Sequence, residues 1–240
     1  MMNAHWKELD TLVLVAGHAV YVAEDFRAVA TDSSWYLQGF QKGEPPFYIE
    51  HIHEGVRLAA EDRKALLVFS GGQTRAEAGP RSEALSYWMV AKHFSWWHRA
   101  SVELRATTEE YARDSFENVL FGICRFCESV GRLPERIRLV SWAFKERRFA
   151  MHRDAIRFPK DRFEFVGANN PVDLAGAEKG EAKAITSFQE DPYGTGDVLR
   201  GKREERNPFQ RAHPYVQSCP KLASLLRHKG PAPYDGDLPW

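Results

Sequence analysis

The stretch best suited to chemistry is "VFSGGQTRAEAGPRSEA", residues 68–84, in which an apolar run stops at a double glycine. Because Gly71 and Gly72 have no side chains, their backbone N–H groups could approach an anion or a carboxylate closely. A polar surface turn would look the same, and the spacing matches neither the P-loop nor the G-x-G-x-x-G pattern. The stretch therefore predicts an anion-binding loop without specifying ATP or NAD. The polar side chains after the glycines are Gln73, Thr74, Arg75 and Arg81.

The end of the same stretch predicts the start of a helix. Pro80 favours a helix start, and Ser82 and Glu83 fall in the first turn. Glu83 has two interpretations: an acid that suits the helix dipole, or a general base in a site.

A second polar stretch, "TTEEYARDSFENV" (107–119), contains another helix start. Asp114 or Ser115 can cap this helix, with Glu117 in its first turn, as in a capping box. Capping does not explain the further polar groups at the same end, which are Glu109, Arg113 and Asn118. Carboxylates gathered in one pocket could act as general bases or bind Mg²⁺ through oxygen. The candidate catalytic residues are Glu83, Glu109 and Glu117.

A third stretch, "VSWAFKERRF" (140–149), reads as a strand that runs into a basic helix. Lys145 and Arg148 are three residues apart and so share one helix face. Such a face is either solvated or, at the carboxyl end of a strand, able to bind an anion.

Several other features do not form sites. Cys124 and Cys127 lie inside a helical pattern, away from an activating helix N-terminus, and Cys219 alone cannot complete a four-ligand zinc site. We therefore expect core cysteines. His51 and His53 lie roughly 200° apart around a helix, so they cannot chelate one metal ion from a single face. "YGTGDVL" follows no apolar strand and is expected to be a loop.

The elements that would position these residues alternate between strands and helices. Continuous apolar runs predict buried strands, and three- to four-residue apolar spacing predicts helices. This alternation predicts an α/β fold, a three-layer Rossmann-like sandwich with a mainly parallel central sheet. The carboxyl ends of parallel strands gather at one edge, where ligands bind. The expected strands are 11–17, 65–72, 136–143 and 163–168, and the expected helices are 47–62, 82–97 and 115–130.

Two regions fall outside the alternation. Residues 18–46 form a long connection that is either a lid over a site or an extension of the packing. Residues 191–240 are turn-rich and charged, with one short helix in "PKLASLLRHK", so residues 1–190 are expected to form the α/β domain and 191–240 an irregular extension packed on it. A charged extension without its own core needs a docking place. We therefore expect Arg203, Arg206 and Asn207 near the pocket.

Composition limits the class of protein. Lys and Arg together number 33, as do Asp and Glu, so the formal net charge of zero argues against a nucleic-acid binder. No stretch reaches the roughly 20 apolar residues of a membrane span. The N-terminus lacks a signal-peptide pattern, and three cysteines make no disulfide framework. We expect a cytoplasmic protein whose partner is a small molecule, not a nucleic acid or a membrane.

Four motifs in order resemble the YdcF-like family, also called the SanA/ElyC group, over residues 11–168. They are "LVLVAGHA", "VFSGGQT" with "RSEA", "EEYARDSFEN" and "VSWAFKERR". Matched one by one, the family's motif residues fall on Ser70, Gly71, Gly72, Ser82, Glu83, Glu109, Glu117, Asn118 and Arg148. Asp114 and Ser115 stand where the family usually has Asn and Thr, and Lys145 stands where a His is common. Since Lys has an unperturbed pKa of about 10.4, this exchange suits anion binding better than proton transfer.

The resemblance implies a Rossmann-like fold and a small-molecule site of nucleotide or S-adenosylmethionine character. Bacterial relatives are linked to envelope metabolism, whereas this chain looks like a soluble, fungal-type subgroup. Two functions follow as hypotheses: an enzyme acting on a phosphorylated or nucleotide-like metabolite, with Mg²⁺ or S-adenosylmethionine as a conceivable cofactor, or a non-catalytic sensor of such a ligand. No residue is assigned to a metal. The candidate ligand-binding residues are Gly17, His18, Ser70, Gly71, Gly72, Gln73, Thr74, Ser82, Arg113, Ser115, Asn118, Trp142, Lys145 and Arg148.

Overall fold

The computed structural model describes residues 4–240 and contains a five-stranded, all-parallel sheet in the order β5-β4-β1-β6-β7. This confirms the predicted α/β fold. The chain fills one side of β1 first and then crosses to the other, so the order reverses between β1 and β6. The strands are β1 (Thr11–Ala16), β4 (Ala65–Ser70), β5 (Ala106–Glu109), β6 (Arg136–Trp142) and β7 (Phe163–Asn169).

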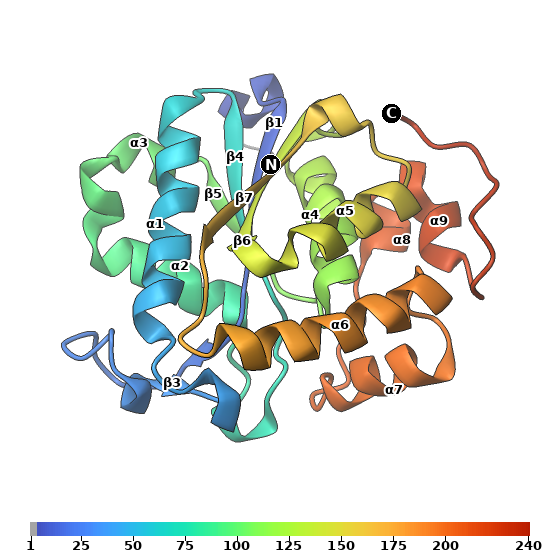
Figure 1. Cartoon of the computed structure of the whole chain (residues 1–240). Helices are drawn as coiled ribbons and strands as arrows, with labels where there is room; N and C mark the ends of the chain where they lie inside the picture. The colour runs from blue at the N-terminus through green and yellow to red at the C-terminus, as the bar shows by residue number, and fades with distance from the viewer. Residues whose placement is uncertain (1–3) are drawn as a thin grey trace.

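Helices cover both faces of the sheet (Figure 1). Successive side chains of a strand point to opposite faces, so Leu12 and Leu14 pack into one hydrophobic cluster and Val13 and Val15 into the other. Burial on both faces explains why these strands are continuous apolar runs. Beside Val13 lie α1 (Pro45–Glu61), α2 (Glu83–His93) and α3 (Ala100–Glu103); beside Leu12 lie α4 (Ser115–Val130) and α5 (Glu146–Ala155).

The edge strand β5 is absent from the sequence prediction. It has the sequence "ATTE", and its first three side chains are only partly buried. A short, polar edge strand carries no apolar run, and its pairing with β4 defines it.

The helix expected over 82–97 ends at His93. Ser95, Trp96, Trp97 and His98 all have φ between 48° and 63°, the left-handed region that side chains disfavour. Trp96 is fully buried in the cluster that contains Val13, and burial of so large a ring offsets part of the strain.

The connection 18–46 contains a two-stranded ribbon and short turns. β2 (Val20–Tyr21) pairs with β3 (Trp35–Tyr36), and the amide of Tyr21 donates to Ser86 Oγ of α2. The segment thus packs on α2 and leads directly into α1.

The C-terminal part is more regular than predicted. After α6 (Leu174–Glu190) come α7 (Asp197–Glu205), α8 (Tyr215–Ser218) and α9 (Ala223–Arg227), so the latter half of "YGTGDVL" begins a helix. Figure 1 shows α8 and α9 beside α4, with α7 below them. The core side chains that the extension shares with α4 are Tyr193, Leu199, Tyr215, Cys219, Leu222 and Leu225.

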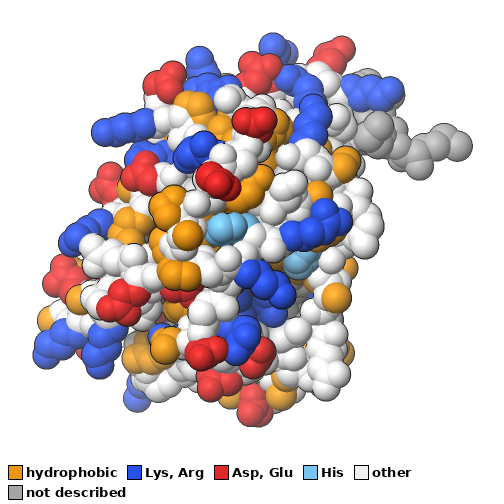
Figure 2. All heavy atoms as spheres, turned by 90° about the vertical axis from the view of Figure 1, so that its right-hand side faces the viewer, with side chains coloured by type: hydrophobic (Ala, Val, Ile, Leu, Met, Phe, Trp, Pro, Cys, Tyr) orange, Lys and Arg blue, Asp and Glu red, His pale blue; other side chains and the backbone are white. Residues whose placement is uncertain are grey.

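Figure 2 views the side of the molecule that lies on the right in Figure 1, with basic and acidic side chains interspersed over it. No helix within residues 4–240 is both long enough and apolar enough to cross a bilayer.

Gly55 is required where α1 crosses β1, since a Cβ atom there would overlap the Cγ2 methyl of Val15. Val15 is fully buried and β-branched, so it cannot turn away. We expect Gly55→Ala to destabilise the protein by about 1–2 kcal/mol in urea denaturation, because overpacking exceeds the gain in helix propensity. Gly201→Ala in α7 is the control: nothing lies within 4 Å of its added methyl, so the same exchange should stabilise by up to about 1 kcal/mol. Equal shifts for both variants would contradict this account.

Candidate functional site

A cavity of about 590 Å³ opens at the carboxyl end of the sheet. Its walls include Gly17 after β1, Glu83 at the start of α2 and Lys145 after β6. Since the strand order reverses between β1 and β6, the cavity lies at the topological switch point, where open α/β sheets bind ligands.

The cavity brings together most of the residues expected at a site. The expected residues that line it are Gly17, His18, Thr74, Glu83, Arg113, Ser115, Asn118, Trp142, Lys145 and Arg148. Those that do not line it are Ser70, Gly71, Gly72, Gln73, Ser82, Glu109 and Glu117. Among the residues that line it without having been expected are Gln41 and Glu44 from the connection, Lys179 and Lys183 from α6, and Asp114.

The double glycine serves a different purpose from anion binding. The amide of Gly71 donates to the Glu109 carbonyl at 3.0 Å, and that of Gly72 to the Ala112 carbonyl at 2.7 Å. Both N–H groups are therefore taken, and the expectation that they hold an anion is wrong. A Cβ atom on Gly71 would lie 2.8 Å from Cβ of Glu83, and one on Gly17 would lie 2.7 Å from it. The glycines let the backbone pass close to Glu83.

Glu83 projects into the cavity from the first turn of α2. Ser82 caps this helix by accepting from the amide of Leu85 at 2.9 Å, so the helix begins at Glu83 and Ser82 precedes the first turn in which it was expected. Glu83 accepts a hydrogen bond from the Thr74 hydroxyl at 2.6 Å. Burial raises the pKa of Glu83, with this hydrogen bond and the cations Arg75, Arg206 and Lys145 acting in the opposite direction.

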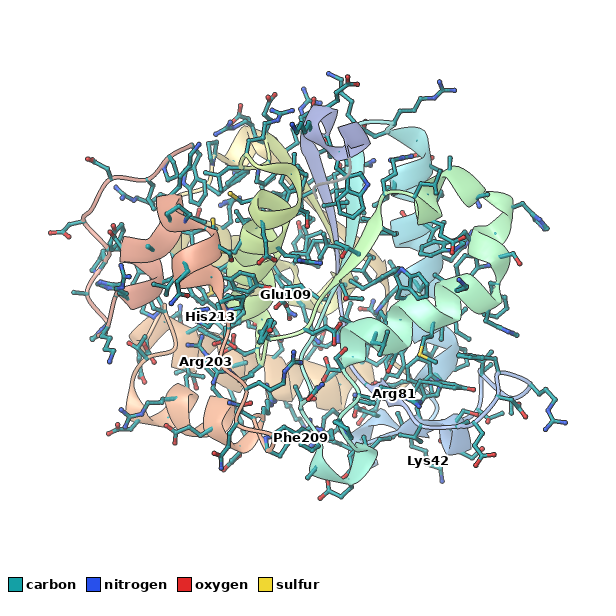
Figure 3. All side chains as sticks on the ribbon, turned by 180° about the vertical axis from the view of Figure 1, so that it is seen from behind. Lys42, Arg81, Glu109, Arg203, Phe209 and His213 are labelled. Carbon is teal, nitrogen blue, oxygen red and sulfur yellow. The ribbon has the colours of Figure 1, made fainter. Side chains whose placement is uncertain are left out.

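Glu109 has a structural role. Its carboxylate is fully buried and accepts hydrogen bonds from Ser70 Oγ, the amides of Tyr111 and Ala112, and the Tyr215 hydroxyl, at 2.7–3.3 Å. Figure 3 shows Glu109 between the sheet and the C-terminal segment that carries His213. Glu109 does not reach the cavity, so it holds the loops that shape the site, and catalysis by Glu109 is not supported.

Glu117 belongs to an ion-pair network in the wall. It pairs with Arg113 at 2.6 Å and with Arg203 of α7 at 3.4 Å, while Arg203 also bonds Asp114 at 2.6 Å. Asp114 caps α4 through the amide of Glu117. Because each charge in this buried network has a partner, Glu117 also acts as a structural carboxylate.

The C-terminal extension (191–240) was expected to bring Arg203, Arg206 and Asn207 near the cavity, and it does so for the two arginines. Arg203 joins the network of Asp114, and Arg206 lines the cavity and donates to the Arg113 carbonyl at 3.0 Å. Asn207 does not line the cavity. It accepts from the amide of Arg211, whose guanidinium donates to the Glu110 carbonyl at 3.0 Å.

The residues fit a divalent cation poorly. Within residues 4–240 there is no group of three or more His, Cys, Asp or Glu side chains that could hold a metal ion. Glu83, Glu109 and Glu117 bond to three different sets of partners. A shared Mg²⁺ site made of these acids is therefore not formed.

Lys145 is the cation best placed for a ligand. It follows β6, is half-buried, and faces the cavity, where burial and then Arg148 lower its pKa to about 7. The Arg148 guanidinium is bound bidentately by Glu181 of α6, at 2.6 and 2.9 Å, and donates to Ser115 Oγ at 2.8 Å. Arg148 is thus largely neutralised, whereas no ion pair involving Lys145 is formed within residues 4–240.

An aromatic wall completes the cavity. His18 stacks on Trp142 with ring centroids 5.7 Å apart and an interplanar angle of 26°. Gln41 donates to the His18 carbonyl, and the Tyr48 hydroxyl donates to Glu44 at 2.6 Å. The connection 18–46 therefore forms one wall of the cavity. The sequence around Glu44, "GEPP", contains no motif that would have predicted this.

Comparison with known proteins adds one relative. The chain is 29% identical over 233 residues to an uncharacterized protein of Saccharomyces cerevisiae, YOR238W, with 77% of each chain covered. No family model matches the chain, and no solved structure matches it.

The burial of Glu109 predicts a pH dependence of stability. Burial raises its pKa from 4.5 to about 7, so between these pH values the folded protein keeps a proton that the unfolded chain has lost. The contribution of the protonated Glu109 to the free energy of unfolding is fully present below about pH 4.5 and is lost as the pH rises through 7. Glu109→Gln removes the titration, so wild-type stability relative to this variant should fall by about 3 kcal/mol between pH 4.5 and 8 in denaturation experiments. Glu110→Gln is the matched control, and parallel curves for wild type and Glu109→Gln would contradict this interpretation.

Proposed function

We propose that this protein is a cytoplasmic enzyme that acts on a small phosphorylated or nucleotide-like metabolite bound in the cavity at the switch point. The observation that carries the proposal is the convergence of Glu83 and Lys145 on one cavity, with their pKa values shifted in opposite directions. Ionisable groups pushed toward neutrality in a cleft are typical of acid–base catalysis.

In this proposal Lys145 holds the anionic group of the ligand. No acidic side chain within residues 4–240 forms an ion pair with its amine, and burial strengthens the attraction of the protonated amine for an anion. Cations at the mouth would attract the ligand and hold further phosphate oxygens. They are Arg75, Lys179, Lys183 and Arg206.

Glu83 exchanges a proton with the ligand. Burial raises its pKa, and in the protonated form the carboxyl can donate to a departing oxygen. Thr74 fixes the carboxyl through Oε1, leaving Oε2 next to the backbone of Gly17 and Gly71. A side chain held by one partner, at a helix start, has the defined orientation that proton transfer requires.

Membership of the YdcF-like family is part of the proposal, supported by the four ordered motifs and by the position of Glu83 and Arg148 in one cavity. A ligand of nucleotide or S-adenosylmethionine character would suit the aromatic wall of His18 and Trp142. The three cysteines are free and buried, which fits a reducing compartment. With 33 basic and 33 acidic residues, a small molecule suits the chain better than a nucleic acid.

Binding should depend on Lys145. We expect Lys145→Gln to weaken ADP binding about 10- to 100-fold in calorimetric titration, since a charge-assisted hydrogen bond contributes about 1.5–3 kcal/mol. Lys160→Gln, an exposed lysine in the turn before β7, should have no effect. Because the pKa of Lys145 is about 7, the amine loses its proton as the pH rises from 6 to 8, and wild-type affinity should decline. Equal affinity of wild type and Lys145→Gln across a panel of phosphate esters and nucleotides would count against an anion site.

Turnover should depend on Glu83. In assays of phosphate esters, nucleotides and methyl donors, with and without Mg²⁺, Glu83→Gln should lower kcat about 10²- to 10⁴-fold while the ligand still binds. The matched control is Glu77→Gln, an acid in the short helical turn between the glycines and α2.

The alternative function, a non-catalytic sensor, predicts instead that a ligand raises Tm without any product in the wild type.

A further inference from the structure

The glutamine before α1 has a fixed amide orientation. Nε2 of Gln41 donates to the His18 carbonyl at 2.8 Å and to the Tyr48 hydroxyl at 3.0 Å. Its Oε1 accepts from the backbone amide of Gln38 at 2.9 Å. Both hydrogens of the NH₂ group are thus used, and the Tyr48 oxygen accepts one of them.

The Tyr48 hydroxyl passes this arrangement on to Glu44. It accepts from Gln41 and donates its own hydrogen to Oε2 of Glu44 at 2.6 Å. Tyr48 is fully buried, and burial raises its pKa, so the hydroxyl keeps this hydrogen at neutral pH. Oε2 of Glu44 is therefore held by a partner within the protein, and the carboxyl has a defined orientation.

The other oxygen of Glu44 is open to a ligand. Oε1 forms no hydrogen bond with any of residues 4–240, and it is not among their buried unpaired atoms, so it has access to solvent. Glu44 lines the cavity at the carboxyl end of the sheet. A ligand in this cavity can therefore reach Oε1.

Glu44 and Lys145 face the same cavity without pairing. Burial raises the pKa of Glu44, and Lys145 acts in the opposite direction. Burial and Arg148 lower the pKa of Lys145, and Glu44 is among the acids that act against this shift. No ion pair within residues 4–240 involves Lys145. The two groups act on one another across the cavity, so one small ligand can contact both.

The chemistry of the cavity favours a hydroxyl group at Glu44 over an ammonium group. A carboxylate oxygen accepts from either. An ammonium group would be repelled by Lys145 and by the cations at the mouth of the cavity, whereas a hydroxyl is uncharged. A hydroxyl can also accept, so it suits the carboxyl in either protonation state. Trp142 and Phe144, with ring centroids 6.4 Å apart, line the same cavity and offer apolar surface to a carbon skeleton.

We propose that Glu44 selects a hydroxylated ligand: Oε1 accepts a hydrogen bond from a hydroxyl group of a phosphate ester whose phosphate lies at Lys145. The ligand class is a phosphorylated sugar or polyol, either free or as the ribose phosphate of a nucleotide. Gln41 and Tyr48 are the residues that position Glu44. The inference rests on the proposed function and adds to it the second contact of the ligand.

This contact gives Glu44 a role in specificity. Oε1 loses its contact with water when a ligand fills the cavity, so a ligand without a hydroxyl leaves the oxygen unpaired. A site built to hydrogen-bond a hydroxyl group rejects an analogue that lacks it.

The test compares two esters of the same size in calorimetric titrations of the full-length protein. They are ribose 5-phosphate and n-pentyl phosphate, which has the phosphate and five carbons without the hydroxyls. Glu44→Gln should weaken ribose 5-phosphate about tenfold, because a charge-assisted hydrogen bond becomes a neutral one. The same exchange removes a negative charge near the phosphate, so it should leave pentyl phosphate unchanged or bind it more tightly.

Two further variants separate the contact from general effects. Glu24→Gln changes an exposed acid of the same connection, outside the cavity, and should affect neither ester. Tyr48→Phe keeps the carboxylate but removes the bond to Oε2. It should weaken ribose 5-phosphate less than Glu44→Gln does and leave pentyl phosphate unchanged, whereas general damage to the site would weaken both.

The outcomes separate this inference from the proposed function. Equal changes for the two esters in Glu44→Gln refute the hydroxyl contact alone, since the phosphate site remains. If neither ester nor ADP binds to the wild type, the proposed function fails and the inference fails with it. Binding of ribose 5-phosphate that depends on Glu44 supports the inference even without turnover. A parallel titration with ADP then identifies the source: tighter binding of ADP indicates a nucleotide, and tighter binding of ribose 5-phosphate a free sugar phosphate.

Discussion

One buried carboxylate connects the parts from which the site is built. Glu109 accepts hydrogen bonds from the end of β4, from the loop after β5 and from Tyr215 in the C-terminal extension. A buried carboxylate is costly unless its oxygens are satisfied, and here every donor comes from a segment that must be correctly placed. Asn118 of α4 joins the same group by donating to Ser70 Oγ at 2.9 Å. The loop carrying Gly71 and Gly72, and with it the position of Glu83, depends on this arrangement.

The charged side chains in and around the cavity are of two kinds, those with an ion-pair partner and those without one. Arg113, Arg148 and Arg203 each have an acidic partner at 2.6 Å, and these pairs join α4, α5, α6 and α7 into a wall. Pairs that are this well buried fix geometry and leave little net charge for a ligand. Lys145 and Glu83 lie inside that wall without such partners, which is why burial shifts their pKa values toward neutrality.

Four of the five strands, and the edge of the sheet at which the cavity lies, could be predicted from the sequence. Apolar runs marked β1, β4, β6 and β7, and the polar stretches after β4 and β6 predicted the edge at which Glu83 and Lys145 meet. The sequence could not distinguish the roles of Glu83, Glu109 and Glu117, because the residues that determine these roles are far away along the chain. Tyr215 bonds to Glu109, and Arg203 pairs with Glu117. β5 and α7 escaped prediction because the first is polar and the second follows a glycine-rich turn without an apolar run.

The polar residues outside the cavity are as informative as those that line it. A buried group that bonds to several partners is held in one position, as Glu109 and Glu117 are. A group that is buried with few partners can exchange a proton near neutral pH, at a cost in stability that the surrounding structure must carry. Burial shifts the pKa values of Glu83 and Lys145 in this direction, and the two side chains share one cavity. Since a scaffold gains nothing from two such groups in one cavity, their convergence supports the proposal of catalysis at this edge of the sheet.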